Sequence, residues 1–179
     1  MPSVFSHAIA AFGIAACFYR PEIPKRVWIA GAVSAALPDL DVVGFGFGVR
    51  YEDFWGHRGF THSFLFAALL AGAVALGLRN SVAGLSVISL WLYLFLATAS
   101  HGLLDALTDG GLGAALFAPF DNTRYFFPWR PIQVAPIGIT RFFTARGWQV
   151  LRSELVWVWL PTSVLMVLMW MIRPWSAAK

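Results

Sequence analysis

Charged residues are scarce in this 179-residue chain, and their scarcity excludes an ordinary soluble domain. Only 12% of the residues are Asp, Glu, Lys or Arg, whereas soluble globular proteins usually contain about 25%. Hydrophobic residues make up 59% of the chain, and the mean hydropathy is +0.68. We therefore expect an integral membrane protein, with residues 1–179 forming a single small domain.

Cysteine and clustered basic residues are also in short supply. Cys17 is the single cysteine, which excludes an intramolecular disulfide and a zinc site built from cysteine ligands. The net charge of +4 comes from Lys and Arg scattered through the loops, so no basic strip indicates nucleic-acid binding. The first apolar run lacks a preceding basic segment and is interrupted by His7, so we expect it to be retained rather than cleaved as a signal peptide.

Long apolar runs, by contrast, predict an all-α, polytopic membrane bundle. We expect four spanning helices, at residues 4–19, 60–78, 82–107 and 155–172. The eleven residues 27–37 are expected to form a short or re-entrant helix, because at 1.5 Å per residue they cover roughly half a bilayer. Residues 108–149 are rich in proline and aromatic side chains and are expected to form an interfacial cap.

The four histidines and several aspartates fall at one end of these apolar runs. If the helices alternate in direction, four separate connections bring these side chains to the same membrane face. Imidazole and carboxylate are ligands of divalent metals, and both are costly to place in or near hydrocarbon. The sequence therefore predicts a metal centre with the ligands His7, Asp39, Asp41, His57, His62, His101 and Asp105.

Single parts of this set also have simpler interpretations. His101 and Asp105 are four positions apart, on one side of a helix, so the carboxylate either shares a metal with the imidazole or only orients it. Asp39 and Asp41 follow a helix C-terminus, where the helix dipole disfavours anions. Either a cation compensates them, or they are solvated turn residues after Pro38. The joint pattern favours the metal.

The ligand types indicate which metal and which chemistry to expect. Mixed imidazole and carboxylate ligation fits Zn²⁺ first, and also suits Mn²⁺ or Fe²⁺. The set exceeds the needs of one four-coordinate ion, so we expect either two metals or one metal with an outer layer of supporting groups. Such centres activate water for phosphoester hydrolysis. We assign a catalytic role to Asp39 or Asp41 as general base and to Arg58 as a phosphate-binding guanidinium.

The motifs around these residues resemble the YdjM-type family of bacterial and archaeal membrane-bound, metal-dependent hydrolases. The matching motifs are His57-Arg58-Gly59-Phe60-Thr61-His62-Ser63, the early His7, Pro38-Asp39-Leu40-Asp41 and His101-Gly102-Leu103-Leu104-Asp105. The resemblance implies a helical protein of a prokaryotic inner membrane whose motif histidines and aspartates bind metal. A more distant similarity, to zinc-dependent phospholipase C and P1-type nucleases, implies phosphoester chemistry.

The expected function is therefore hydrolysis of a phosphoester in a lipidic or phosphorylated membrane-proximal substrate, with membrane lipids as partners. A transporter or channel for metal ions or protons is the main alternative, but it would place ionisable groups at successive depths across the membrane. A haem-binding electron carrier and a non-catalytic metal-binding membrane protein are the other candidates. Basic residues near the opposite helix ends favour a centre that faces outside the cytoplasm.

Overall fold

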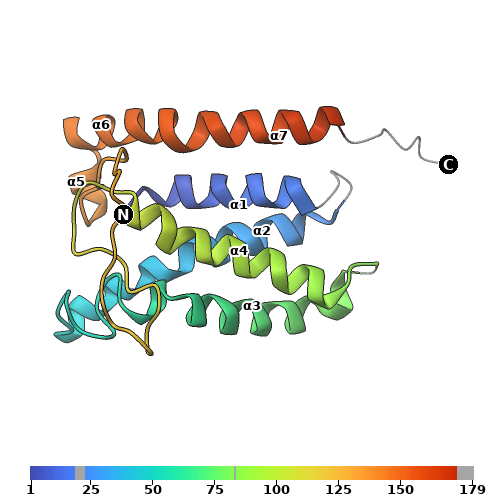
Figure 1. Ribbon diagram of the computed structural model, residues 1–179, viewed down its shortest axis with the longest axis horizontal. Coiled ribbons are helices and arrows are strands. Elements are labelled where there is room, and N and C mark those ends of the chain that lie inside the picture. The colour runs from blue at the N-terminus through green and yellow to red at the C-terminus, as the bar shows by residue number, and fades with distance from the viewer. Residues whose placement is uncertain (19–22, 83, 173–179) are drawn as a thin grey trace.

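The protein is a helical bundle, as the sequence predicts. A computed structural model describes residues 1–18, 23–82 and 84–172, and these residues form helices and loops with no β-strand (Figure 1). Four helical segments are long and apolar enough to cross a membrane: Lys25–Phe47, Phe64–Ser81, Val87–Ala106 and Ala145–Ile172. A fifth apolar helix, α1 (Val4–Phe18), is shorter. The prediction of an all-α polytopic bundle is confirmed.

The short helix is the first one rather than the segment 27–37 that the sequence indicated. α2 (Lys25–Ala36) is continued by the 3-10 helix η1 (Leu37–Phe47), so the whole segment reaches 23 residues. Pro38 lies in the first turn of η1, and it has no backbone N–H to donate to the last turn of α2. The proline therefore changes the type of helix without ending the segment, and η1 extends beyond the predicted segment 27–37 to Phe47.

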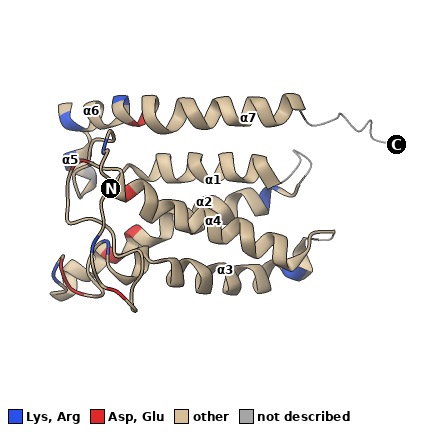
Figure 2. Ribbon diagram, viewed as in Figure 1, with Lys and Arg blue, Asp and Glu red and all other residues tan. Residues whose placement is uncertain are grey.

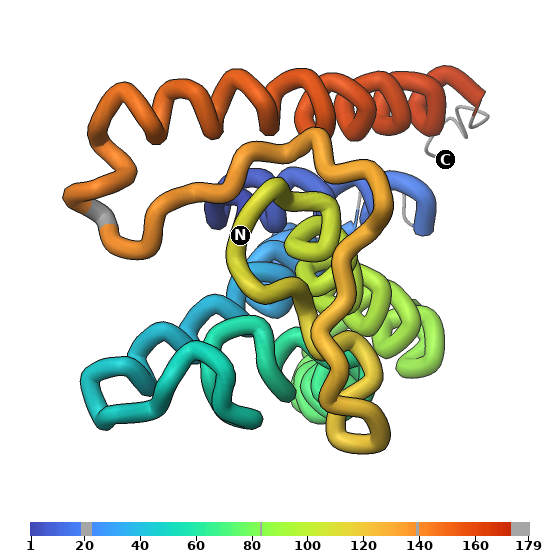
Figure 3. Tube along the Cα trace, turned by 60° about the vertical axis from the view of Figure 1, so that its left-hand side comes forward, coloured from blue at the N-terminus to red at the C-terminus, as the bar shows by residue number. Residues whose placement is uncertain are grey.

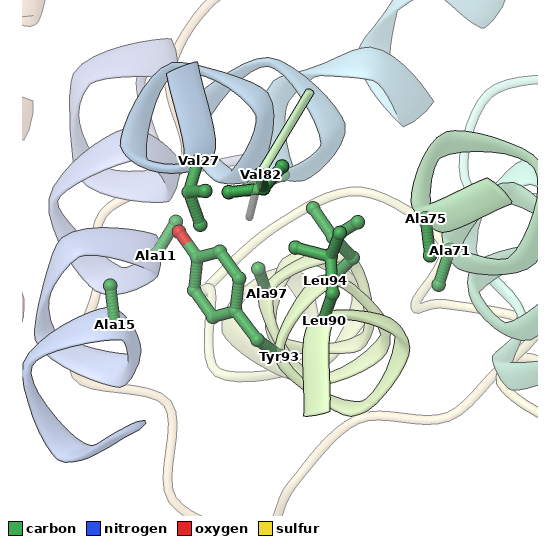
Figure 4. Packing of buried hydrophobic residues seen from close by; sticks show 11 residues of the cluster. Ala11, Ala15, Val27, Ala71, Ala75, Val82, Leu90, Tyr93, Leu94 and Ala97 are labelled. Carbon is green, nitrogen blue, oxygen red and sulfur yellow. The ribbon is translucent and has the colours of Figure 1, made fainter. Parts of the chain in front are cut away.

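Small residues let the central helices approach one another closely. α3 (Phe64–Leu78) contributes Ala71 and Ala75 to the core, where they face Leu94 of α4 (Val87–Ala106) (Figure 4). On α2, a methyl group added to Gly31 would lie 1.7 Å from the hydroxyl oxygen of Tyr93 on α4. Small residues at helix interfaces allow such close packing, which is how membrane helices associate where lipid offers no hydrophobic driving force.

The last spanning segment lies alongside α1 (Figure 1). It consists of α6 (Ala145–Glu154), the π-helical turn η4 (Leu155–Trp159) and α7 (Leu160–Ile172). Only 6% of its most apolar window is buried inside the protein, so most of its surface is available to lipid. A short helix, α5 (Ile139–Phe142), precedes it.

The longer loops gather at one end of the bundle, together with the N-terminus (Figures 1 and 3). There the segment 107–138 folds back across the end of α4: Phe127 N donates to Ala106 O at 2.9 Å, and Asp109 N donates to Ile132 O at 2.9 Å. Among the described residues, the acidic side chains lie at this end, whereas basic ones occur at both ends (Figure 2). The fold thus collects its carboxylates on one side of the bundle.

Candidate metal centre

Four side chains from three separate elements meet at the loop end of the bundle. Asp39 comes from η1, His62 from the 3-10 turn η2 (Phe60–His62), and His101 and Asp105 from the last two turns of α4. Each offers one nitrogen or oxygen atom, and these atoms all lie within 4.8 Å of one another. The two imidazoles and Asp105 are buried, and Asp39 is 11% exposed. The structure thus brings these four of the predicted ligands together.

The spacing of the four atoms suits one divalent cation. His62 Nε2 lies 3.0 Å from His101 Nε2 and 3.2 Å from Asp105 Oδ2. Asp39 Oδ1 lies 3.3 Å from His101 Nε2 and 3.7 Å from His62 Nε2. Asp105 Oδ2 lies 3.9 Å from His101 Nε2. Ligand atoms held at about 2.0–2.1 Å by a tetrahedral metal stand about 3.3 Å apart, so the observed spacings bracket the ideal one.

The hydrogen bonds of the two imidazoles point their free lone pairs at the same place. His101 Nδ1 lies 2.7 Å from the carbonyl oxygen of Ala35, which can only accept, so this nitrogen carries the hydrogen. Thr61 Oγ1 donates to Asp41 Oδ2 at 2.8 Å and therefore accepts from His62 Nδ1 at 3.0 Å. Both neutral rings then present an Nε2 lone pair, and the two lone pairs face each other across 3.0 Å. A cation or a shared proton must separate them.

The carboxylates of the cluster also require positive charge close to them. In the part of the chain that the structure describes, both oxygens of Asp39 and of Asp105 are buried without a hydrogen-bond partner. Asp105 has an ion-pair partner in Arg58, but two buried carboxylates beside each other are strongly destabilising unless more positive charge compensates them. Burial alone would lower the pKa of His62, but the carboxylates of Asp105, Asp39 and Asp41 outweigh burial and raise this pKa to about 10. The centre therefore holds positive charge, which a proton supplies on His62 or a metal supplies between the ligands.

His7 reaches the same centre from α1. It is fully buried, and its ring stacks on His101 with 3.7 Å between centroids. Its Nε2 atom lies 3.9 Å from Asp39 Oδ2 and 4.0 Å from Asp105 Oδ1. These are the carboxylate oxygens that do not take part in the contacts with His62 and His101. The amino group of Met1 also lies 3.9 Å from Asp105 Oδ1. His7 therefore approaches the carboxylates of Asp39 and Asp105 through the oxygens that His62 and His101 do not contact.

Asp41 and His57 lie behind His62. His57 Nδ1 donates to Asp41 Oδ1 at 2.7 Å, while Asp41 Oδ2 lies 3.3 Å from His62 Nδ1, the ring nitrogen opposite the one that faces His101. Burial lowers the pKa of His57, and the hydrogen bond to Asp41 only partly offsets this. A carboxylate in this position fixes the tautomer of a metal-binding histidine and raises its basicity. Asp41, His57 and one nitrogen of His62 also form a second possible ligand group.

Arg58 is buried beside Asp105. Its Nε atom lies 3.0 Å from Asp105 Oδ2, and its two terminal nitrogens donate to Gly110 O and Thr108 Oγ1, each at 2.9 Å. The residue has a φ of 65°, which a non-glycine residue adopts only at a cost. These contacts hold the guanidinium against a carboxylate of the centre. Its predicted role in binding phosphate stays a prediction.

Three contributors were missed by sequence reasoning: Thr61, Thr108 and Glu154. The two hydroxyls act through Asp41 and Arg58, and nothing in the sequence marks them out. Glu154, at the end of α6, is fully buried and accepts hydrogen bonds from Ser3 N, Ser3 Oγ and Ser6 Oγ. It thereby caps α1 one turn before His7. A lone acid beside the last apolar run was a usable signal, because such groups are costly near hydrocarbon.

The sequence is similar along nearly its whole length to known inner membrane proteins. The model of the family described as YdjM inner membrane protein matches residues 1–176. The inner membrane protein YbcI of Escherichia coli (strain K12) is 44% identical over 174 residues, which cover 97% of this chain and 99% of that protein. No solved structure gives a significant match. The two descriptions give a location and no activity.

Proposed function

The chain belongs to the YdjM inner membrane protein family, and we propose that it is a membrane-embedded, metal-dependent hydrolase. Its substrate is a phosphoester of a lipidic or membrane-proximal molecule. The observation that carries the proposal is the pair of Nε2 atoms of His62 and His101, 3.0 Å apart and flanked by the buried carboxylates of Asp39 and Asp105. A set of two imidazoles and two carboxylates suits Zn²⁺ first, and Mn²⁺ or Fe²⁺ next.

We assign each residue of the centre a role from its position. A divalent cation held by His62, His101, Asp39 and Asp105 would lower the pKa of a water molecule and polarise a phosphoryl oxygen. Asp39 is the only one of the four with a partly exposed side chain, although both of its oxygens are buried. As the ligand nearest to solvent, it is assigned the role of accepting a proton from that water. Asp41 and His57 orient His62, and Arg58 compensates the charge of Asp105.

His7 is the candidate ligand of a second cation. His7 Nε2 lies 3.9 Å from Asp39 Oδ2 and 4.0 Å from Asp105 Oδ1, and neither nitrogen of His7 has a hydrogen-bond partner within the described ranges. His7, with Asp39 and Asp105, would help to hold that second cation. Paired cations of this kind stabilise both the attacking and the leaving oxygen in phosphoryl transfer.

The grouping of the charges favours a hydrolase over a transporter. A transport path requires ionisable groups at successive depths. Among the described residues, the acidic side chains lie at the loop end, and α3 carries no charged residue along its length (Figure 2). The histidines lie beside these carboxylates. A centre at one membrane surface instead suits a substrate whose polar part lies at the interface.

The test combines metal analysis with activity. Detergent-purified protein is expected to contain at least one divalent metal per chain and to cleave members of a phosphomonoester and phospholipid panel, with activity lost on chelation and restored by Zn²⁺. His62→Ala and Asp105→Ala are expected to lose the metal and to reduce activity by about 100-fold or more. Asp109→Asn, a change at an exposed carboxylate outside the centre, is the matched control and should retain both.

Two outcomes would contradict the proposal. Metal-free protein with full activity would remove the metal from the mechanism. Stoichiometric metal without cleavage of any phosphoester in the panel would leave a metal-binding membrane protein that is not a phosphoesterase.

A further inference from the structure

An apolar groove of about 420 Å³ runs along the seam between α3 and α4, under the loop that follows α4. Its walls include Phe64 and Ala68 from α3, Trp91 and Phe95 from α4, and Leu116 and Phe117 from the loop. This volume lies within the range of about 300–1,000 Å³ that is usual for small-molecule sites. The one polar atom of Trp91 is already used, because its indole N–H donates to Ala68 O at 3.1 Å. The groove therefore offers its occupant only hydrocarbon and aromatic surface.

The groove shares a wall with the candidate metal centre. Phe64 follows His62 by two residues, and its backbone N–H donates to Leu116 O at 2.9 Å. Leu116 in turn packs against Gly102, the neighbour of His101: a methyl group added to Gly102 would meet Leu116 Cδ2 at 2.9 Å and His62 O at 2.6 Å. The end of the groove at Leu116 is thus separated from the imidazoles of His62 and His101 only by the residues next to them.

The groove leads away from the centre and into the depth of the membrane. Both helices that form it are long and apolar enough to span a bilayer. Trp91 precedes His101 by ten positions on α4, which is about 15 Å along a helix axis. A molecule with its polar group at the centre and its tail in the groove would therefore lie along the bilayer normal, as a membrane lipid does.

We propose that the seam between α3 and α4 binds the hydrocarbon chain of the substrate, and that the substrate is a long-chain lipid phosphoester whose phosphate reaches the metal centre. This inference rests on the proposed function and narrows its substrate class. Three features identify the occupant as a lipid chain: the wholly apolar lining, the continuity of the groove with the lipid-facing surface of two spanning helices, and the wall shared with the centre.

The test compares two substrates that differ in their chains. Ala68→Phe fills the groove, and Leu69→Phe adds the same ring at the next position, which is exposed and outside the lining. With hexadecyl phosphate, Ala68→Phe is expected to lower kcat/KM by about tenfold or more, because displacing two or three buried methylene groups is enough for that loss. With p-nitrophenyl phosphate, which lacks the chain, Ala68→Phe should change kcat/KM less than twofold. Leu69→Phe should affect neither substrate.

A binding measurement separates this inference from the proposed function. Hexadecyl phosphate with a diazirine in its chain should label peptides containing Phe64–Ala68 and Trp91–Phe95 in the wild type and in His62→Ala, and less in Ala68→Phe. Labelling of the groove without hydrolysis would support the chain site and reject the phosphoesterase. Hydrolysis with labelling spread evenly over the lipid-facing helices, or equal effects of Ala68→Phe on both substrates, would overturn the chain site alone.

Discussion

Thr61 shows how an uncharged side chain can control the charged centre. Its hydroxyl donates to Asp41 Oδ2 at 2.8 Å and accepts from His62 Nδ1 at 3.0 Å. It therefore fixes which ring nitrogen of His62 carries the hydrogen and which faces His101. Supporting groups of this kind commonly change metal affinity by about 10–100-fold when they are removed.

Two substitutions at Thr61 distinguish the effect of its hydroxyl group from the effect of its side-chain shape. Thr61→Val is expected to weaken metal binding by about 10–100-fold, whereas Thr61→Ser keeps the hydroxyl and should remain within about threefold of the wild type. Competition with a chelator of known affinity measures both. Equal metal affinity in Thr61→Val and the wild type would show that the tautomer of His62 is set by Asp41 alone.

Gly102 governs how α4 meets the turn that carries His62. An added methyl group would lie 2.6 Å from His62 O, a backbone atom, so the two elements would have to separate. The same helix carries His101 and Asp105, so separation would move two ligands relative to a third. The contact therefore links the packing of two elements to the geometry of the centre.

Gly102→Ala is expected to destabilise the protein by about 1–3 kcal/mol, the usual cost of overpacking, and to weaken metal binding. Gly77→Ala is the control, because Gly77 lies in α3 with nothing within 4 Å of an added methyl group. This change should be neutral or stabilising by up to about 1 kcal/mol. Thermal unfolding in detergent, with and without chelator, measures both. Equal melting temperatures for the two variants would contradict the role of the close contact.

At the scale of the whole molecule, the basic residues bear on orientation. Lys25, Arg26 and Arg79 lie near the ends of spanning helices on the side away from the centre (Figure 2), and positive residues near helix ends favour the cytoplasm. We predict that the centre faces outside the cytoplasm and that the C-terminus lies inside. A reporter fused to the C-terminus that is active only in the cytoplasm should give signal. Signal instead from a reporter active only outside would reverse the orientation.

The convergence of the ligands could be predicted from the sequence because helix direction alternates and helix periodicity is regular. His101 and Asp105, four residues apart, had to share a face. The different positions of Asp39, which joins His101, and Asp41, which contacts His57, could not be predicted in the same way. They lie in a 3-10 helix with about three residues per turn, so side chains two positions apart diverge, one toward His101 and the other toward His57. The continuation of the helix past Pro38, which produces this divergence, has no clear mark in the sequence.

The supporting contacts depend on packing between distant segments, which a single sequence does not encode locally. Arg58 meets Thr108 and Gly110 across fifty or more positions, and its left-handed backbone conformation is typical of glycine rather than arginine. An arginine in a polar loop suggests contact with substrate. Arg58 is instead buried against Asp105, because its loop packs over the end of the bundle.

The cap that Glu154 provides for α1 has a consequence for how the protein is made. Glu154 accepts hydrogen bonds from Ser3 and Ser6, and it is translated about 150 residues after them. The hydrogen bonds that cap α1 therefore cannot form before the last spanning segment has been synthesised. Because α1 also packs against that segment, the helix that carries His7 completes its contacts only after the rest of the chain has been made.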